Sequence, residues 1–134
     1  MILGLGIDLC DIRRIEALLE QFGDRFLEKV FSDEERAYIV SRPARLKAGT
    51  CAKRFAAKEA CAKALGTGIA HGIQFKDLCV TSDPAGRPGM ELRGRARARL
   101  DTMVPPGHSA RIEISLTDEY PMAMAQVILH ALIS

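Results

Sequence analysis

The stretch KRFAAKEACAKALGTGI, residues 53–69, is the part of the sequence that decides the fold. Its first part, up to Leu65, belongs to a longer segment from Leu46 to Leu65 that is rich in alanine and lysine. Gly66-Thr67-Gly68 follows this segment directly. Alanine and lysine favour helices and glycine ends them, so this segment predicts the longest helix in the chain. The side of the helix that packs against the rest of the protein is marked by small and apolar residues, namely Ala52, Phe55, Ala56, Ala60 and Leu65.

The residues before this helix predict a strand and two shorter helices. The strand is apolar, the first short helix repeats its apolar residues at helical spacing, and the second opens with Ser32-Asp33-Glu34-Glu35 in the S-x-x-E form of a capping box. We expect a strand at Met1–Ile7 that ends at Asp8, a helix at Ile12–Phe22 between Asp11 as its cap and Gly23 as its stop, and a helix at Asp33–Val40.

The residues after the long helix predict mostly strands. Ser109–Thr117 alternates apolar and polar residues, as a half-buried strand does, and Asp83-Pro84-Ala85-Gly86 has the chemistry of a turn. The expected elements are strands at Phe75–Ser82, Met90–Leu92, Ser109–Thr117 and Met122–Ile133, and a helix from about Ala96 to Met103. This order predicts an α+β fold in one domain, residues 1–134, with a mainly antiparallel sheet packed against the long central helix.

Composition excludes several functional classes. The chain has 134 residues, with 19 basic and 17 acidic side chains, and a net charge of +2 does not by itself indicate a nucleic-acid or membrane partner. The four cysteines form no CxxC and the three histidines are far apart, which argues against a structural zinc site. There is no export signal and no apolar segment long enough to span a membrane, so we expect a cytoplasmic protein with reduced thiols and no membrane contact.

Two carboxylates are candidates for chemistry. Asp8 follows an apolar strand, where an aspartate is most often a turn or cap residue. Glu59 lies one turn beyond Phe55, at the edge of the packed side of the long helix. Spacing alone favours an ordinary helix pair between Glu59 and Lys63, four residues on. The alternative is that Asp8 and Glu59 share a hard divalent cation while Lys63 faces an anion. Two carboxylates suffice for magnesium, which completes its shell with water and phosphate oxygens.

Two further features carry weaker signals. Gly66-Thr67-Gly68 can approach an anion closely, but as the end of a helix it is more simply a C-cap. Arg93, Arg95, Arg97 and Arg99 form the one dense basic run, which is either a solvated helix face or a nucleic-acid surface. With no tryptophan and 5% aromatic residues, the chain has few rings on which bases could stack, so the solvated face is favoured.

Together these pieces resemble the holo-acyl-carrier-protein synthases, the small bacterial 4′-phosphopantetheinyl transferases. The resemblance covers the whole chain in order, and the central helix carries its most specific motif. The matching stretches are Gly4–Ile12 followed by Arg14-Ile15, Phe31–Glu35, Arg54–Ala60, Lys63–Ile69, Asp83–Pro88, Ile114–Tyr120 and Ala123–Val127. In Asp83–Pro88, arginine stands where the family has the lysine of a Gly-Lys-Pro turn.

The resemblance implies an enzyme that moves the phosphopantetheine arm of coenzyme A onto a serine of apo acyl carrier protein and releases 3′,5′-ADP. The family's metal positions fall on Asp8 and Glu59, which implies that Mg²⁺, or Mn²⁺ in its place, bridges them and the pyrophosphate of coenzyme A. Asp8, Glu59 and Lys63 are then the catalytic residues, with Lys63 neutralising a phosphate oxygen. Glu59 itself and a metal-bound water are both candidates for the base that deprotonates the serine.

The resemblance also implies the binding sites and the assembly. The coenzyme A site is expected to comprise Arg54, Lys63, Gly66, Gly68, Gly86, Arg87, Pro88 and Thr117. Arg14 and Leu18 correspond to the family's carrier-protein surface, and acyl carrier proteins are acidic. The family forms homotrimers whose active sites lie between subunits.

One departure from the family pattern and two rival functions follow from the same residues. Asp118 stands where many members have histidine, so it is expected to hold water or a basic side chain rather than the nucleotide. A nucleic-acid-binding module would use the arginine run, and its binding would weaken steeply with salt. An acyltransferase would bind coenzyme A without requiring a metal at the pyrophosphate. Both rivals rank below the transferase.

Overall fold

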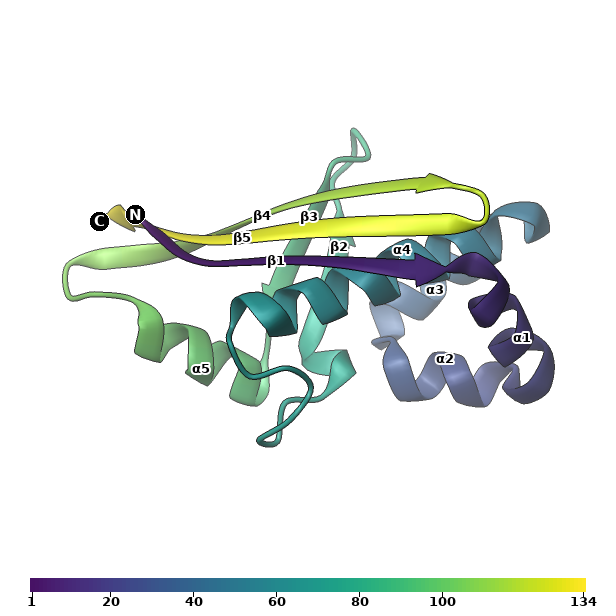
Figure 1. The fold of residues 1–134 in the computed structure, drawn as a ribbon, viewed down its shortest axis with the longest axis horizontal. Coiled ribbons are helices and arrows are strands. Elements are labelled where there is room, and N and C mark those ends of the chain that lie inside the picture. The colour runs from purple at the N-terminus through teal and green to yellow at the C-terminus, as the bar shows by residue number, and fades with distance from the viewer.

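A three-stranded antiparallel sheet lies across the long helix α4 (Ala44–Ala64) in the computed structural model, which describes all residues 1–134 (Figure 1). The strands lie side by side in the order β1 (Ile2–Asp11), β5 (Met122–Ile133) and β4 (His108–Glu119), so β1 and β4 form the two edges. Helix α4 packs against β1 and β5. The predicted α+β fold, with an antiparallel sheet packed against a long central helix, is confirmed.

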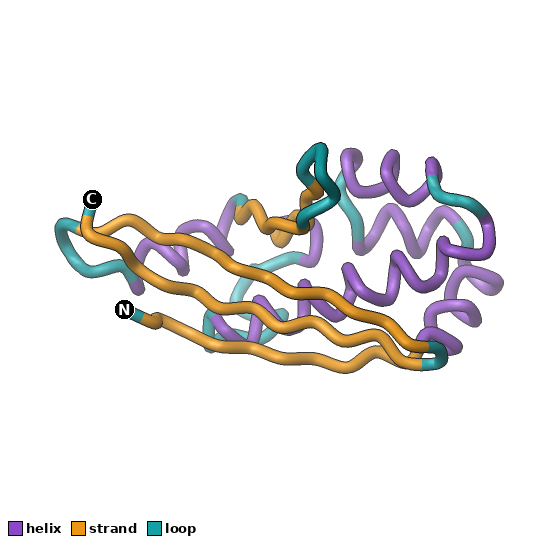
Figure 2. The backbone as a smooth tube through the Cα atoms, turned by 90° about the horizontal axis from the view of Figure 1, so that it is seen from above, coloured by secondary structure: helices purple, strands orange, loops and turns teal.

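Four shorter helices, a 3₁₀ turn and a hairpin complete the fold. A second sheet of two strands, β2 and β3, contacts β4 and extends past that edge of the main sheet (Figures 1 and 2). The remaining elements are α1 (Ile12–Phe22), α2 (Asp24–Val30), α3 (Asp33–Ser41), a 3₁₀ turn (Phe75–Asp77), β2 (Leu78–Ser82), β3 (Pro88–Leu92) and α5 (Gly94–Met103). Buried residues from all of these helices and both sheets contribute to one apolar core.

The helix ends follow the capping chemistry of the sequence. Asp11 accepts a hydrogen bond from the backbone N–H of Arg13 and caps α1, and Gly23 ends that helix with a positive φ of 54°. Ser32 and Glu35 form the predicted capping box at the start of α3. These local signals fix where the chain turns, and they place α1 beside α4.

Strand β1 and helix α4 pack backbone against backbone. A Cβ atom on Gly4 would overlap the carbonyl oxygen of Ala64, and one on Gly6 would overlap that of Ala60. Only glycine allows two backbones to approach this closely. The next residue of the strand that faces the helix is Asp8, and it is therefore held against α4. The close packing of β1 on α4 is what positions Asp8.

A buried ion pair ties α3, α4 and β2 together. Lys58 and Glu35 are both fully buried, and the Lys58 Nζ donates to Glu35 Oε1 at 2.7 Å and to the carbonyls of Phe75 and Leu78. Glu35 also accepts from the backbone N–H groups of Ser32 and Val80. Each charge is therefore compensated and hydrogen-bonded, which is the condition for burying it.

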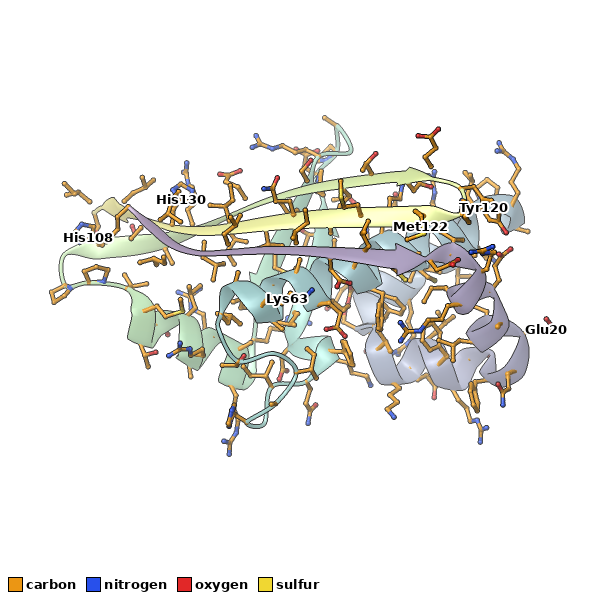
Figure 3. All side chains as sticks on the ribbon, viewed as in Figure 1. Glu20, Lys63, His108, Tyr120, Met122 and His130 are labelled. Carbon is orange, nitrogen blue, oxygen red and sulfur yellow. The ribbon has the colours of Figure 1, made fainter.

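The face of the sheet that points away from α4 is uncovered and apolar along β1 and β5. Six large apolar side chains on it are between 37% and 61% exposed: Leu5, Ile7, Leu9, Met122, Met124 and Leu132. We call these six residues the outer sheet face. Figure 3 labels Met122 on this sheet. Exposed apolar side chains gathered on one face in this way are typical of a surface that binds another molecule. None of the helices is both long and apolar enough to cross a membrane.

Three local predictions are wrong. The first strand does not end at Asp8 but continues to Asp11, because its residues go on pairing with β5, as Leu9 does with Met124. The first three residues of the predicted strand Phe75–Ser82 form a 3₁₀ turn whose Phe75 carbonyl accepts from Lys58. Helix α2 was not predicted, because its seven residues are too few to show helical periodicity clearly.

Candidate active site at the edge of the sheet

Asp8, Glu59 and Lys63 lie together where β1 crosses α4. The Lys63 Nζ donates to the Asp8 Oδ1 at 2.9 Å and to the carbonyl oxygen of Ile7 at 3.0 Å. Figure 3 shows Lys63 directly beneath β1. The Glu59–Lys63 helix pair that spacing alone favours is not formed, because Lys63 reaches across to the strand instead. An ammonium group has three N–H donors, so one remains available to an anion.

Glu59 is half-buried beside this pair, and its surroundings oppose its charge. Burial raises the pKa of Glu59, and the negative charge of Asp8 raises it further, against smaller opposing effects of Lys63 and Arg14. Of the two carboxylates, only Asp8 has a hydrogen-bonded cation, which leaves the cluster short of positive charge. No group of three or more histidine, cysteine, aspartate or glutamate residues could hold a metal, so this pair is a site only for an ion that takes its remaining ligands from elsewhere.

A cavity of about 480 Å³ opens beside Glu59 between α1, α2 and α4. Its floor is apolar, and three basic residues stand among its walls. The Arg14 guanidinium lies 5.5 Å from the centre of the Phe55 ring. The lining residues are Arg14, Leu18, Phe22, Arg25, Phe26, Lys29, Val30, Phe55, Glu59 and Phe75. Arg14 and Leu18 were expected here, whereas Arg25, Phe26 and Lys29 were missed together with helix α2.

A second group of predicted site residues lies beyond the other edge of the sheet. Arg54, Gly86 and Pro88 line a cavity of about 190 Å³ that Leu116 of β4 closes on one side. Most of the Arg54 side chain is already engaged: it donates to the carbonyl of Val80 and to the Ser82 hydroxyl, and it stacks 4.2 Å from the centre of the Tyr38 ring. Burial lowers its pKa.

The other predicted coenzyme A residues are spread around these two groups. Gly66 and Gly68 follow α4 with positive φ, and their backbone N–H groups donate to the carbonyls of Lys63 and Ala62, as a helix C-cap does. Arg87, at the tip of the β2–β3 hairpin, pairs with Glu113 of β4 at 3.1 Å. Thr117 is exposed on the face of β4 opposite Leu116, which faces the core.

Within one chain the predicted site is therefore divided. Asp8, Glu59 and Lys63 lie beside β1, and Arg54 with the β2–β3 hairpin lies beyond β4. The two edges of a three-stranded sheet are roughly 10 Å apart. Glu59 and Arg54 are five residues apart on α4, so their side chains leave the helix about 140° apart. The structure brings Asp8, Glu59 and Lys63 together. It does not bring these three residues next to the cavity that Arg54, Gly86 and Pro88 line.

The arginines of the basic run at α5 make contacts within the chain. Arg93 pairs with Glu34 and Glu91, Arg97 pairs with Asp101, and Arg99 donates to the carbonyl of Leu65 at the end of α4. These contacts favour the interpretation as a solvated helix face over a nucleic-acid surface. Asp118 holds a basic side chain, that of Lys53, at 3.1 Å.

Comparison with known proteins decides the family. A model of the 4′-phosphopantetheinyl transferase superfamily matches residues 4–125. The chain belongs to this superfamily. It is 57% identical to a holo-[acyl-carrier-protein] synthase of Rhodopseudomonas palustris over 98% of this chain and 96% of that protein, and 54% identical to one of Granulibacter bethesdensis over 98% and 90%.

Solved structures agree with this assignment. The crystal structure of holo-[acyl-carrier-protein] synthase from Neisseria meningitidis superposes with a TM-score of 0.82 at 34% identity, covering 97% of this chain and 99% of that one. The Helicobacter pylori enzyme, solved in complex with coenzyme A, gives a TM-score of 0.78 at 28% identity and covers 94% and 99%. The resemblance seen in the sequence and the phosphopantetheinyl transferase fold are confirmed.

Proposed function

We propose that this superfamily member is a holo-acyl-carrier-protein synthase that transfers the 4′-phosphopantetheine group of coenzyme A to a serine of apo acyl carrier protein. We further propose that it releases 3′,5′-ADP and works with a divalent ion held by Asp8 and Glu59. The observation that carries the proposal is the meeting of these two carboxylates with Lys63 where β1 crosses α4. The names of the relatives support the overall reaction.

The residues present fit Mg²⁺, or Mn²⁺ in its place. Asp8 and Glu59 are half-buried and only Asp8 is paired with an ammonium group, so the two carboxylates attract a further cation. Magnesium commonly takes only one or two protein carboxylates. When bound, the ion would draw negative charge from the pyrophosphate of coenzyme A. Asp8 is held in place by its hydrogen bond from Lys63 and by the glycines that press β1 onto α4.

Each charged residue of the cluster then has a role of its own. Lys63 offers its remaining N–H to a phosphate oxygen and neutralises the charge that develops as the serine oxygen attacks the phosphorus and the phosphoanhydride bond to the leaving 3′,5′-ADP breaks. Glu59 forms part of the cavity wall where a carrier protein would present its serine, which puts its carboxylate within reach of the hydroxyl proton. Phe55 and Phe75 stack at 5.4 Å between ring centres and form an apolar wall beside it.

The cavity between α1 and α2 suits an acidic carrier protein. Arg14, Arg25 and Lys29 surround an apolar floor, so an incoming partner would meet positive charge at the rim and apolar side chains within. Such a surface steers an acidic protein toward the site and gives it an apolar anchor. The docked carrier would place its serine next to Glu59.

Reversing the charge of Arg14 tests this docking surface. We expect Arg14→Glu to lower kcat/KM for apo acyl carrier protein by about 30-fold, roughly 2 kcal/mol, because a cation that faces an acidic partner becomes an anion. The dissociation constant for coenzyme A, measured by titration calorimetry, should stay within twofold. Arg97→Glu on α5 is the matched control, and equal losses of carrier and coenzyme A binding in the Arg14 variant would remove α1 from the docking site.

We propose a homotrimer with active sites between subunits. In one chain, the carboxylates beside β1 and the cavity beyond β4 lie at opposite edges of the sheet, and the outer sheet face leaves apolar residues exposed between them. A neighbouring copy that covers this face could bring its β4 edge and β2–β3 hairpin to the β1 edge of the first. Burying the face would gain roughly 25 cal/mol per Å² of apolar surface.

A charge on the outer sheet face should disrupt the assembly. We expect Leu9→Arg to convert a trimer into monomers, seen as a threefold fall in mass by light scattering coupled to size-exclusion chromatography, because an arginine cannot be buried there without a partner. Transfer activity should fall at least tenfold. Val40→Arg, at an equally exposed apolar residue on α3, is the control. A Leu9→Arg protein that stays trimeric would place the subunit contacts elsewhere.

The proposed reaction is tested by intact mass spectrometry of apo acyl carrier protein. The carrier is incubated with this protein, coenzyme A and Mg²⁺, and a parallel sample contains a chelator. A gain of one phosphopantetheine group that the chelator abolishes would support the reaction and its metal together. A gain that survives the chelator would refute the role of the metal. In a further sample with acyl-coenzyme A in place of coenzyme A, a gain of the acyl group alone would indicate an acyltransferase.

A further inference from the structure

Lys58 is a fully buried cation, next to Glu59 in the sequence, that the proposed chemistry does not use. Neighbouring side chains leave an α-helix about 100° apart, so Lys58 points into the core while Glu59 faces the cavity between α1 and α2. None of the Lys58 side chain is exposed, so it touches neither coenzyme A nor a carrier protein. Any part that Lys58 plays in the reaction therefore runs through the residues it holds.

The ammonium group of Lys58 holds the backbone on both sides of the 3₁₀ turn. It has three N–H donors and three acceptors. These are Glu35 Oε1 at 2.7 Å, the Phe75 carbonyl oxygen at 2.8 Å and the Leu78 carbonyl oxygen at 2.7 Å. Phe75 is the first residue of the turn, and Leu78 is the residue that follows it. One side chain of α4 therefore fixes where this turn lies.

Glu35 fixes the ammonium group in turn. It is fully buried and accepts from the backbone N–H groups of Ser32 at 3.0 Å and Val80 at 3.1 Å, which leaves it no freedom to move with Lys58. The guanidinium of Arg54 lies 4.0 Å from its other oxygen, but Arg54 keeps separate hydrogen bonds to Val80 and Ser82. The position of Arg54 therefore does not depend on Lys58.

The turn carries one side of the cavity wall beside Glu59. The Phe75 ring stacks on the Phe55 ring at 5.4 Å between centres and 28° between planes, and Phe55 lies one turn before Glu59 on α4. All three residues line the same cavity. Residues 65–74, which lead into the turn, form no helix or strand. The far end of the turn is held by Arg93, whose N–H donates to the Asp77 carbonyl, and the Phe75 end is held by Lys58.

We infer that Lys58 is a positioning residue for the carrier protein, because it holds the Phe75 side of the wall that stands beside Glu59. This inference rests on the proposed function, in which the carrier docks in this cavity and presents its serine to Glu59. If the turn moves, the carrier loses an apolar contact where the serine has to arrive. The residues assigned to coenzyme A keep their own contacts.

The test removes the hydrogen bond to Phe75 without leaving a buried charge unpaired. Lys58→Met/Glu35→Gln replaces the ammonium group by an apolar group of similar length and keeps an acceptor for the two backbone N–H groups. Glu35→Gln alone is the matched control, because it removes the charge pair but leaves Lys58 on both carbonyls. Phe75→Ala removes the wall and leaves the buried pair intact. Kinetic constants for apo acyl carrier protein and for coenzyme A are measured on each variant and on the triple variant.

We expect the KM for the carrier to rise about tenfold in Lys58→Met/Glu35→Gln and in Phe75→Ala, and less than about threefold in Glu35→Gln. The kcat and the dissociation constant for coenzyme A, measured by calorimetry, should stay within about threefold in all of them. Because Lys58 acts through Phe75, the triple variant should have a carrier KM within about twofold of that of Phe75→Ala. A purely structural role would instead lower the amount of folded enzyme, which lowers the apparent kcat and leaves both KM values unchanged.

Three results would overturn the inference: effects on the carrier KM that multiply in the triple variant, an equal rise in Glu35→Gln alone, or an unchanged carrier KM in Phe75→Ala. The last result stands even if Lys58→Met/Glu35→Gln does not fold, because Phe75→Ala leaves the buried ion pair in place. A wild type that does not modify the carrier refutes the proposed function, whereas an active wild type with any of these three results refutes only the role of Lys58.

Discussion

Glu59→Gln is expected to lower the kcat/KM of phosphopantetheine transfer by about a thousandfold, which corresponds to ~4 kcal/mol of lost transition-state stabilisation. Glutamine keeps the size of the side chain but removes the negative charge that Asp8 and Glu59 together present to a divalent ion. It also removes the carboxylate that could accept the serine proton. Activity measured across a magnesium titration should not recover at high metal concentration, because the base is lost with the metal ligand.

The fold should survive this change. Glu59 is half-buried, its carboxylate makes no hydrogen bond within the chain, and burial together with the charge of Asp8 already opposes its ionisation. We therefore expect the thermal midpoint of Glu59→Gln to equal or exceed that of the wild type. Glu91→Gln on β3 serves as the matched control for a lost carboxylate. Wild-type turnover in Glu59→Gln at every magnesium concentration would exclude the proposed role of Glu59.

The sequence predicts most elements of this fold because their signals are local. Asp11, Gly23 and the Ser32–Glu35 capping box act within one turn of a helix, and the alternation in Ser109–Thr117 follows from one buried face. Where the prediction is wrong, the deciding contact comes from elsewhere in the chain. The residues after Asp8 stay extended because they pair with β5, a strand more than 100 residues later.

The candidate site is predictable in its residues but not in its arrangement. The motif around Glu59 and the resemblance of the first strand name Asp8, Glu59 and Lys63, and the structure brings these three together. Their pairing is not readable from spacing, which favours Lys63 with Glu59, because the strand that supplies Asp8 is distant in sequence. The division of the expected coenzyme A residues between two edges of the sheet depends on the strand order β1-β5-β4, which local patterns do not encode.

Lys58 illustrates a second limit of sequence patterns. It lies next to Glu59 in a helix rich in lysine, and nothing in its local sequence separates it from the exposed Lys63. In the structure it is fully buried and holds Glu35 and two carbonyl groups. A buried lysine needs partners from three other segments, and only the assembled fold supplies them.

Gly6→Ala is expected to destabilise the protein by at least about 4 kcal/mol, a large part of the 5–15 kcal/mol that typically holds a domain together. A methyl group on Gly6 would overlap the carbonyl oxygen of Ala60, and both groups belong to backbones that are fixed in a sheet and a helix. No rotation of a side chain can relieve this overlap, so β1 must move away from α4. Urea unfolding followed by circular dichroism measures the loss.

The same displacement should abolish activity in whatever fraction of Gly6→Ala remains folded, because Asp8 follows Gly6 by two residues and would leave Glu59 and Lys63. Gly89→Ala is the matched control: it is also a strand glycine, but its methyl group would meet only the side-chain hydroxyl of Thr81, at 2.8 Å. That side chain can turn aside, so we expect a cost of about 1 kcal/mol. If Gly6→Ala unfolds within 1 kcal/mol of the wild type, β1 does not rest on α4 backbone to backbone, and the position of Asp8 needs another explanation.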